Sequence, residues 1–222
     1  MPPKRSVQKG IYVYCVIRSE NADFGPIGFG NSDVHTIEYR DLCPVVSEAE
    51  LKEYDVDEKD VETHRRVVRR VLEEHDVLPV AYGMVFKGRK NLAVAMSAGY
   101  AAMKKAWPVV EGRVELGVKV IKPRNADMNG QDEEIRRGIV GFLSAASVDF
   151  KNLDLFSDRL LLNTAFLVER SRIDEFSERV SAIIEEHSDL RTNYSGPWPP
   201  YNFVDIHILG KSRKGFRQAR IN

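Results

Sequence analysis

The segment Gly196-Pro197-Trp198-Pro199-Pro200-Tyr201 constrains the fold more than any other part of this chain of 222 residues. Each proline fixes φ near about −65° and lacks a backbone donor, so the segment can neither continue a helix nor occupy a central strand. Residues that precede proline are pushed to extended conformations, which predicts a stiff, polyproline-like rod around one tryptophan. We expect a strand over residues 202–209, directly after this rod. Such a rod either anchors a core or presents an aromatic surface to a partner.

The composition is that of a soluble globular protein. Apolar residues make up 43% and charged residues 30%, which excludes wholesale disorder. Lys+Arg and Asp+Glu both number 33, and this balance argues against nucleic-acid binding by bulk charge. No apolar run approaches the roughly 18 residues that span a bilayer, and residues 1–5 lack the apolar core of a signal peptide. Cys15 and Cys43 lie in apolar runs, so we expect buried thiols in a reducing cytoplasm.

Hydrophobic periodicity predicts an α+β chain. We expect strands over residues 11–17, 34–39, 42–47, 77–83, 113–122, 159–169 and 190–194, in addition to 202–209. We expect helices over residues 58–75, 92–107, 133–147 and 173–187, with Asp57 capping the first. The pattern favours mixed or antiparallel sheets covered by helices.

The polar, turn-rich residues 123–132 mark the expected domain boundary. We predict an N-terminal α+β domain over residues 10–122 and a C-terminal α+β domain over residues 133–210. The tails, residues 1–9 and 211–222, are expected to be flexible. The second tail is basic and contains no acidic residue.

The glycine-rich stretch Gly25-x-x-Gly28-x-Gly30 has two interpretations. A phosphate-binding loop would lead into a helix N-terminus, whose free amides face the anion. Here a strand-like run follows, and no Lys-Ser/Thr pair is present, so a hairpin loop is favoured. The alternative that this stretch leaves open is a small-ligand or nucleotide-binding enzyme with a ferredoxin-like fold.

The sequence contains no pattern typical of a metal or catalytic site. The five histidines form no i,i+4 pair and have no cysteine neighbours at zinc spacing. No nucleophile elbow or kinase motif is present. His64 lies on the apolar face of its helix, and we expect a hydrogen-bonded core histidine there. We therefore predict no catalytic residue, metal or cofactor.

RNA binding is a third, less favoured hypothesis. Tyr12 and Tyr14 share one face of the first strand, but the aromatic consensus of the common RNA-recognition strand is missing. An RNA-binding module would rely instead on the basic tail after residue 210. The same two tyrosines are candidates for contact with a protein partner.

The sequence resembles the gas vesicle accessory proteins of the GvpF/GvpL family. The most specific segment is Gly-Pro-Trp-Pro-Pro-Tyr-x-Phe-Val at residues 196–204. Segments that resemble other parts of the family follow in the same order: residues 11–14, 41–47, 77–86 and 113–120, with His64 at the position of a helix histidine. The departures are Tyr82 and Met84, where phenylalanine and threonine are expected.

The resemblance implies two small α/β sandwich domains with ferredoxin-like features and no catalysis. It implies an accessory or assembly protein for gas vesicles, located in the cytoplasm and associated with the vesicle. The partners implied are the hydrophobic shell protein and other accessory proteins, without nucleic acid, membrane or small-molecule substrate.

The aromatic residues around the proline rod are the main contact candidates. In the expected final strand, Val204, Ile206 and Ile208 share one face. If that face is core, then Trp198, Tyr201 and Phe203 form an exposed aromatic patch, and such residues dominate binding hot spots. The alternative is that Trp198 and Tyr201 fill the gap between a sheet and its helices.

Overall fold

The computed structural model describes residues 8–18, 21–124, 132–205, 207 and 209, and the chain forms two compact α+β units. Unit 1 comprises Met1–Glu111 and Val204–Asn222, and unit 2 comprises Gly112–Phe203. The α+β class is as predicted, but the division of the chain differs from the predicted one. The strand at residues 113–121 pairs only with strands of unit 2, so the division falls before it and not at residues 123–132. The chain then returns to unit 1 after Phe203.

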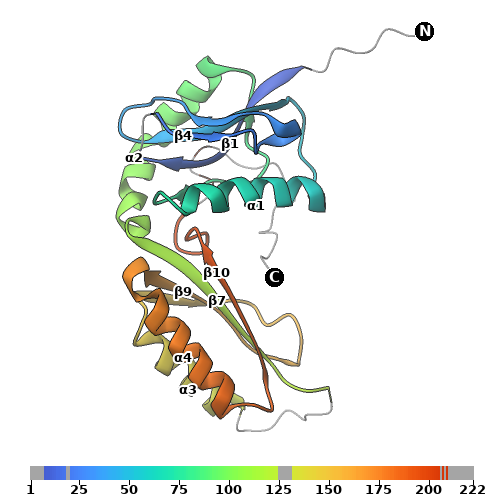
Figure 1. The fold of residues 1–222 in the computed structure, drawn as a ribbon, viewed down its shortest axis with the longest axis vertical. Coiled ribbons are helices and arrows are strands. Elements are labelled where there is room, and N and C mark those ends of the chain that lie inside the picture. The colour runs from blue at the N-terminus through green and yellow to red at the C-terminus, as the bar shows by residue number, and fades with distance from the viewer. Residues whose placement is uncertain (1–7, 19–20, 125–131, 206, 208, 210–222) are drawn as a thin grey trace, which may run out of the picture. The chain divides into compact units, whose positions relative to one another are not determined.

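Unit 1 is built on an antiparallel sheet (Figure 1). Its strands are β1 (Lys9–Ile17), β2 (Asp23–Gly25), β3 (Val34–Thr36), β4 (Cys43–Glu50), β5 (Leu78–Pro79) and β6 (Val85–Phe86). The order is β2-β3-β4-β1-β5, and β6 also pairs with β1. Lys9 already pairs with Glu50, so β1 begins within the predicted tail; residues 1–7 and 210–222 lie outside the described residues.

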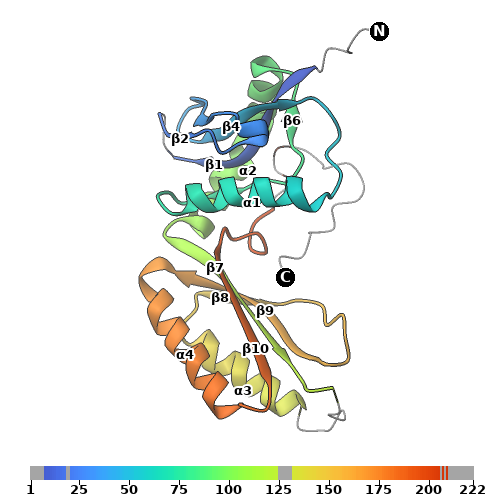
Figure 2. The same cartoon turned by 45° about the vertical axis from the view of Figure 1, so that its right-hand side comes forward.

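Two helices cover opposite faces of this sheet (Figure 2). Helix α1 (Glu58–Leu72) begins as predicted, because Asp57 Oδ1 accepts hydrogen bonds from the amides of Lys59 and Asp60 at 3.0 and 3.3 Å. Helix α2 (Arg89–Val110) packs its apolar side on the face of β1 that carries Val13. Successive strand residues point to opposite faces, so Tyr12 faces α1.

The face of β1 under α1 carries a buried polar–aromatic cluster. Tyr12 Oη accepts the Gly83 amide at 2.8 Å, which leaves its own proton for His64 Nδ1 at 3.1 Å. Tyr14 Oη lies 2.8 Å from Ser47 Oγ. His64 is thus the hydrogen-bonded core histidine that the sequence predicts. Tyr12 and Tyr14 are both 0% exposed, so neither offers surface to a partner, and their prediction as contact residues is wrong.

The glycine-rich stretch forms a hairpin loop, as predicted. It joins β2 to β3, which pair antiparallel, with the short 3-10 helix η1 (Phe29–Asn31) between them. Gly25 and Gly30 have φ values of 75° and 62°, which glycine adopts at little cost. No α-helix follows directly, so the loop lacks the helix N-terminus on which a phosphate cradle depends.

Unit 2 has a ferredoxin-like βαββαβ arrangement. Its elements are β7 (Arg113–Ile121), α3 (Asp132–Ser144), β8 (Asp149–Asn152), β9 (Leu160–Glu169), η2 (Arg170–Arg172), α4 (Ile173–Glu186) and β10 (Arg191–Trp198). The sheet order is β10-β7-β9-β8, with every pair antiparallel. Sequence reasoning missed β8, whose four residues are all exposed and carry no alternating apolar pattern.

The helices of unit 2 cover one face of its sheet and leave the other without a helix, although Leu167, Ala165 and Asn163 of β9 are buried on that second face. Val114, Leu116, Val118 and Val120 are buried beneath α3 and α4, as the alternating pattern predicts. Glu115, Gly117 and Lys119 alternate with them and therefore point to the other side, which we call the open face. Figures 1 and 2 show both helices of unit 2 on one side of its sheet.

None of the described residues among 202–209 lies in a strand, so the predicted final strand is wrong for this part of the chain. Residues 201–203 form a turn, and the last strand is β10, which ends at Trp198. Val204 and Leu209 pack against the core of unit 1, whereas Ile206 and Ile208 lie outside the described residues. Strand β10 contains Pro197 but lies at the sheet edge, where proline is tolerated.

Cys15 and Cys43 are buried free thiols, as predicted. Burial raises the pKa of the Cys15 thiol well above its usual range. Within the described residues, no group of three His, Cys, Asp or Glu side chains is arranged to hold a metal ion. No described helix has both the length and the apolar character needed to cross a membrane.

The buried His64 predicts an acid-sensitive core in unit 1. Burial, and then the neighbouring Arg65 charge, lowers the pKa of His64 to about 3. In the unfolded chain histidine titrates near about 6.5, so the unfolded state binds the proton first and stability falls as pH falls below that value. Between about pH 7.5 and 5 this group alone removes about 2 kcal/mol. In chemical denaturation, His64→Asn should lose less stability than the wild type over this range; equal losses would contradict the assignment.

Candidate functional site

The proline–tryptophan segment lies against β7 in unit 2. Strand β10 pairs with β7 so that Trp198 lies opposite Glu115, with an irregularity in register between Ser195 and Trp198. Gly196 has a φ of 119°, and a Cβ there would lie 2.8 Å from the carbonyl oxygen of Glu115. Only glycine allows both this backbone conformation and this approach.

Beyond Trp198 the chain makes a tight turn. The Tyr201 amide donates to the Pro199 carbonyl at 2.6 Å, and the Phe203 amide donates to the Pro200 carbonyl at 3.1 Å. Both prolines are buried. Because the prolines hold φ fixed, this turn is held with little loss of chain entropy.

A buried carboxylate anchors the turn to the open face of the sheet. Glu115 is 5% exposed, and its two oxygens accept the backbone amide and the side-chain amide of Asn202 at 2.8 and 2.6 Å. The Asn202 carbonyl in turn accepts a hydrogen bond from Lys151 Nζ at 2.7 Å. Asn202 is therefore held on three sides by β7 and β8. We call these three residues the turn anchor.

The turn anchor contains a carboxyl group whose pKa lies near neutral pH. Burial raises the pKa of Glu115 to about 7, although the hydrogen bonds from Asn202 and the charge of Lys151 favour the ionised form. Both carboxyl oxygens are occupied by Asn202. A carboxyl held in this way serves to position the turn, since a general base needs a free oxygen that reaches a substrate.

The structure brings together three of the five predicted contact residues. Trp198, Tyr201 and Phe203 are each half-buried within or next to the turn. Residues directly opposite in an antiparallel pair point to the same face, so Trp198 lies on the open face with Glu115. It does not fill the gap between the sheet and its helices, and for Trp198 that alternative is wrong.

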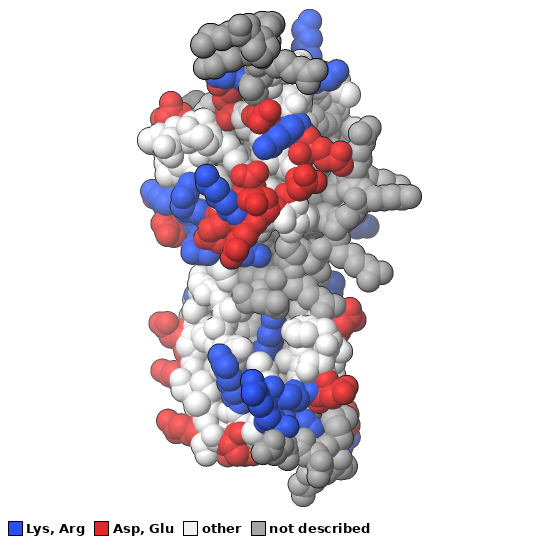
Figure 3. Space-filling view, turned by 90° about the vertical axis from the view of Figure 1, so that its right-hand side faces the viewer, with Lys and Arg blue, Asp and Glu red and all other residues white. Residues whose placement is uncertain are grey.

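Cationic and further aromatic side chains lie around the turn on the open face. Lys151 Nζ is 5.4 Å from the centre of the Phe203 ring, and Lys119 Nζ is 5.7 Å from that of Phe156. Phe156 is 53% exposed. The pairing register places Arg191 on the same face. Figure 3 shows Lys and Arg side chains gathered on unit 2.

Sequence reasoning missed the residues that hold this site. Glu115 lies in a mostly apolar strand, and an acid followed 87 positions later by an amide gives no local signal that the two residues pair. Lys151 and Phe156 lie in or after the strand that went unrecognised. Asn202 follows Pro199, Pro200 and Tyr201, and asparagine after such a run is typical of a turn.

The arrangement of both units agrees with the comparisons with known proteins. A family model described as gas vesicle synthesis protein GvpL/GvpF matches residues 10–138 and 122–205. The chain belongs to the GvpL/GvpF family. Membership connects it with gas vesicle synthesis, as the resemblance of residues 196–204 indicates.

Relatives cover this GvpL/GvpF chain over nearly its whole length. It is 35% identical over 213 residues to gas vesicle protein F1 of Halobacterium salinarum, a match that spans 94% of this chain and 99% of the relative. It is 38% identical over 210 residues to gas vesicle protein F of Haloferax mediterranei, spanning 92% and 98%.

Solved structures show the same fold. The crystal structure of the gas vesicle protein GvpF from Anabaena sp. PCC7120 superposes with a TM-score of 0.79 at 18% identity, covering 89% of this chain and 97% of that one. The GvpF structure from Microcystis aeruginosa gives a TM-score of 0.78, also at 18% identity, covering 88% and 99%.

The turn anchor predicts a pH dependence opposite to that of His64. Because the folded-state pKa of Glu115 is raised to about 7, the folded chain binds more protons than the unfolded chain below that value. The resulting stability is fully present below about pH 4.5 and is lost as pH rises through about 7, a change of about 2–3 kcal/mol between pH 5 and 8. Glu115→Gln should remove this component in denaturant titrations at the two pH values. If the variant and the wild type show the same change in the free energy of unfolding between pH 5 and 8, Glu115 does not have a raised pKa.

Proposed function

We propose that this GvpL/GvpF protein is a non-enzymatic assembly factor that binds the hydrophobic gas vesicle shell protein, together with other accessory proteins. It acts in the cytoplasm and associates with the vesicle. The contact lies on the open face of unit 2, around Trp198, Tyr201 and Phe203. The observation that carries this proposal is the turn anchor, which holds large aromatic side chains on a face that no helix of unit 2 covers.

The physical logic of the site is preorganisation. A shell subunit with a large apolar surface aggregates unless a partner covers it. Aromatic anchors are effective in such contacts when their positions are fixed before binding, since little rotamer and loop entropy is then lost. The prolines fix the turn, and Glu115 and Lys151 fix its place on the sheet.

The same contacts favour a binding role over catalysis. The carboxyl group with a pKa near 7 is engaged by Asn202 through both oxygens. The hairpin loop at Gly25–Gly30 leads into a strand, which removes the main support for a nucleotide-binding enzyme. A thermal-shift panel of nucleotides and divalent metals should leave the melting temperature unchanged, and a saturable increase would reinstate that alternative.

The test compares shell-protein binding by two surface variants. Trp198→Ala should weaken binding to immobilised shell protein by about tenfold or more, because a central aromatic anchor is lost. Val94→Ser is the matched control: Val94 is 70% exposed on α2 and lies outside the proposed site, so binding should be unchanged. Melting temperatures are measured for both variants. A large stability loss in Trp198→Ala with full binding by the folded fraction would reject the contact role.

A further inference from the structure

A groove lies between the two helices of unit 2, on the side away from the open face. It has a volume of about 500 Å³. Its lining comes from one side of α3, over most of the helix, and from the last part of α4: Glu134, Ile135, Gly138, Ile139, Phe142, Ile183, Glu186 and His187. Phe142 is 44% exposed, and the Arg179 guanidinium lies 5.0 Å from the centre of its ring.

Two glycines in α3 have no explanation within the fold. Glycine inside a helix is unfavourable relative to alanine, so it usually serves a close approach or a positive φ. A Cβ added at Gly138 or at Gly141 would meet no atom within 4 Å, and neither glycine has a positive φ. Gly138 lines the groove, whereas Gly141 does not. At Gly138, the missing side chain keeps the groove open.

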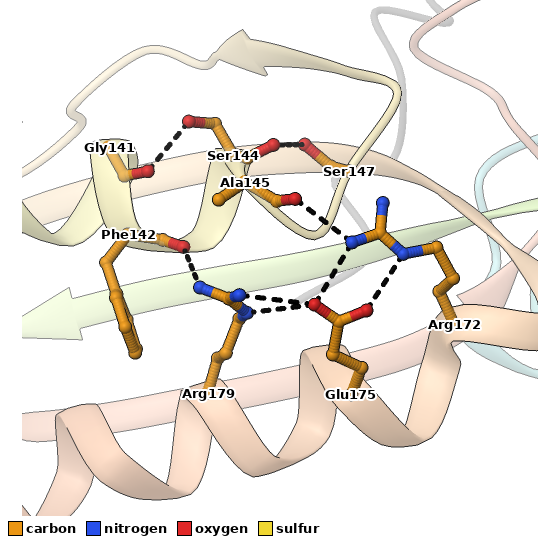
Figure 4. Close-up of polar contacts among 8 residues, drawn as sticks. All are labelled: Gly141, Phe142, Ser144, Ala145, Ser147, Arg172, Glu175 and Arg179. Carbon is orange, nitrogen blue, oxygen red and sulfur yellow. Dashed lines mark hydrogen bonds and ion pairs between the residues drawn. The ribbon is translucent and has the colours of Figure 1, made fainter.

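A polar network braces the other end of the helix pair (Figure 4). Arg179 donates to the Phe142 carbonyl at 3.1 Å, and Arg172 donates to the Ala145 carbonyl at 3.0 Å. Glu175 accepts from both arginines at 2.9–3.3 Å. Arg172, just before α4, and Glu175 and Arg179 within α4 thereby hold the C-terminal end of α3. Because these contacts fix the two helices relative to each other, the groove is already formed before any partner binds.

The rim of the groove is acidic. Glu134 and Glu186 are exposed on its opposite sides, and within the described part of the chain neither forms a hydrogen bond or an ion pair. Of the arginines on the two helices, Arg136 bonds to Glu133 and to the Leu161 carbonyl, and Arg179 bonds to Glu175. Arg137 is exposed and is not among the lining residues, which include one histidine, His187.

We propose that this groove binds a basic amphipathic helix of another polypeptide. Apolar side chains of the partner would contact Ile135 and Phe142, above the buried Ile139, and its backbone would approach α3 at Gly138. Lysine or arginine side chains beside that apolar stripe would pair with Glu134 and Glu186. This is the helix-in-groove mode of recognition, in which charge complementarity requires a positively charged partner helix. The inference goes beyond the proposed function, because the groove lies on the other side of the sheet and does not need the shell protein.

The probe for this site is a 14-residue model peptide of leucine and lysine with an amphipathic helical pattern. Fluorescence anisotropy should show saturable binding to the full chain, and Gly138→Leu should weaken it about tenfold or more by filling the groove. Gly141→Leu is the matched control: it makes the same change in the same helix outside the groove and should bind as the wild type does. Both substitutions should raise the melting temperature, since they remove a helical glycine.

Further measurements test the role of the glutamates at the groove rim and whether a second copy of the chain fills the groove. The Glu134→Gln/Glu186→Gln double variant should bind the peptide several-fold more weakly, while Glu178→Gln, on the exposed surface of α4 outside the groove, should not. A peptide with glutamate in place of every lysine should not bind detectably. Equal binding by Gly138→Leu and Gly141→Leu, or by the two peptides, would overturn the proposal. So would a wild-type dimer in sedimentation that Gly138→Leu dissociates, because a second copy would then occupy the groove.

Discussion

The hydrogen bonds between Glu115 and Asn202 determine how the proline–tryptophan segment is used. Burying a carboxyl group is costly, and the cost is offset here by two short bonds from one asparagine and by the nearby Lys151. These bonds join the chain beyond Trp198 to strands β7 and β8 of unit 2. With them, the turn becomes a rigid extension of β7, and its aromatic side chains take defined positions on the open face.

The difference between the two sides of unit 2 follows from the alternation of apolar and polar residues along β7. Residues 113–121 place valine and leucine side chains toward α3 and α4, and glutamate, glycine and lysine toward the open face. The covered side builds the core on which the helices rest, and the helices then form an acidic-rimmed groove beyond it. The open side carries the turn anchor and the cations around it. The surfaces assigned to partners therefore differ in charge as well as in position.

The elements that sequence reasoning predicted well are those with a strong local signal. Asp57 caps α1 as expected, and the alternation in β7 marks the core side correctly. The predictions were wrong where contacts between residues distant in sequence override the local hydrophobic pattern. Residues 202–209 are apolar and alternating, but the buried Glu115 binds Asn202 and Val204 packs against the core of unit 1, so the described residues of this segment are not in a strand. Tyr12 and Tyr14 looked like surface aromatics because the partners that bury them, among them His64, Ser47 and Gly83, are distant in sequence. The pairing of Glu115 with Asn202, 87 positions apart, has no local signature at all.

The central claim is that the aromatic residues contact the shell protein only while the turn anchor holds them. The most direct measurement is the affinity of Glu115→Ala for immobilised shell protein, made together with hydrogen exchange at the amides of residues 202 and 203. This variant keeps Trp198, Tyr201 and Phe203 and leaves no buried charge behind. We predict faster exchange at both amides and about tenfold or greater loss of affinity in a folded protein. Wild-type affinity combined with a released turn would contradict the account.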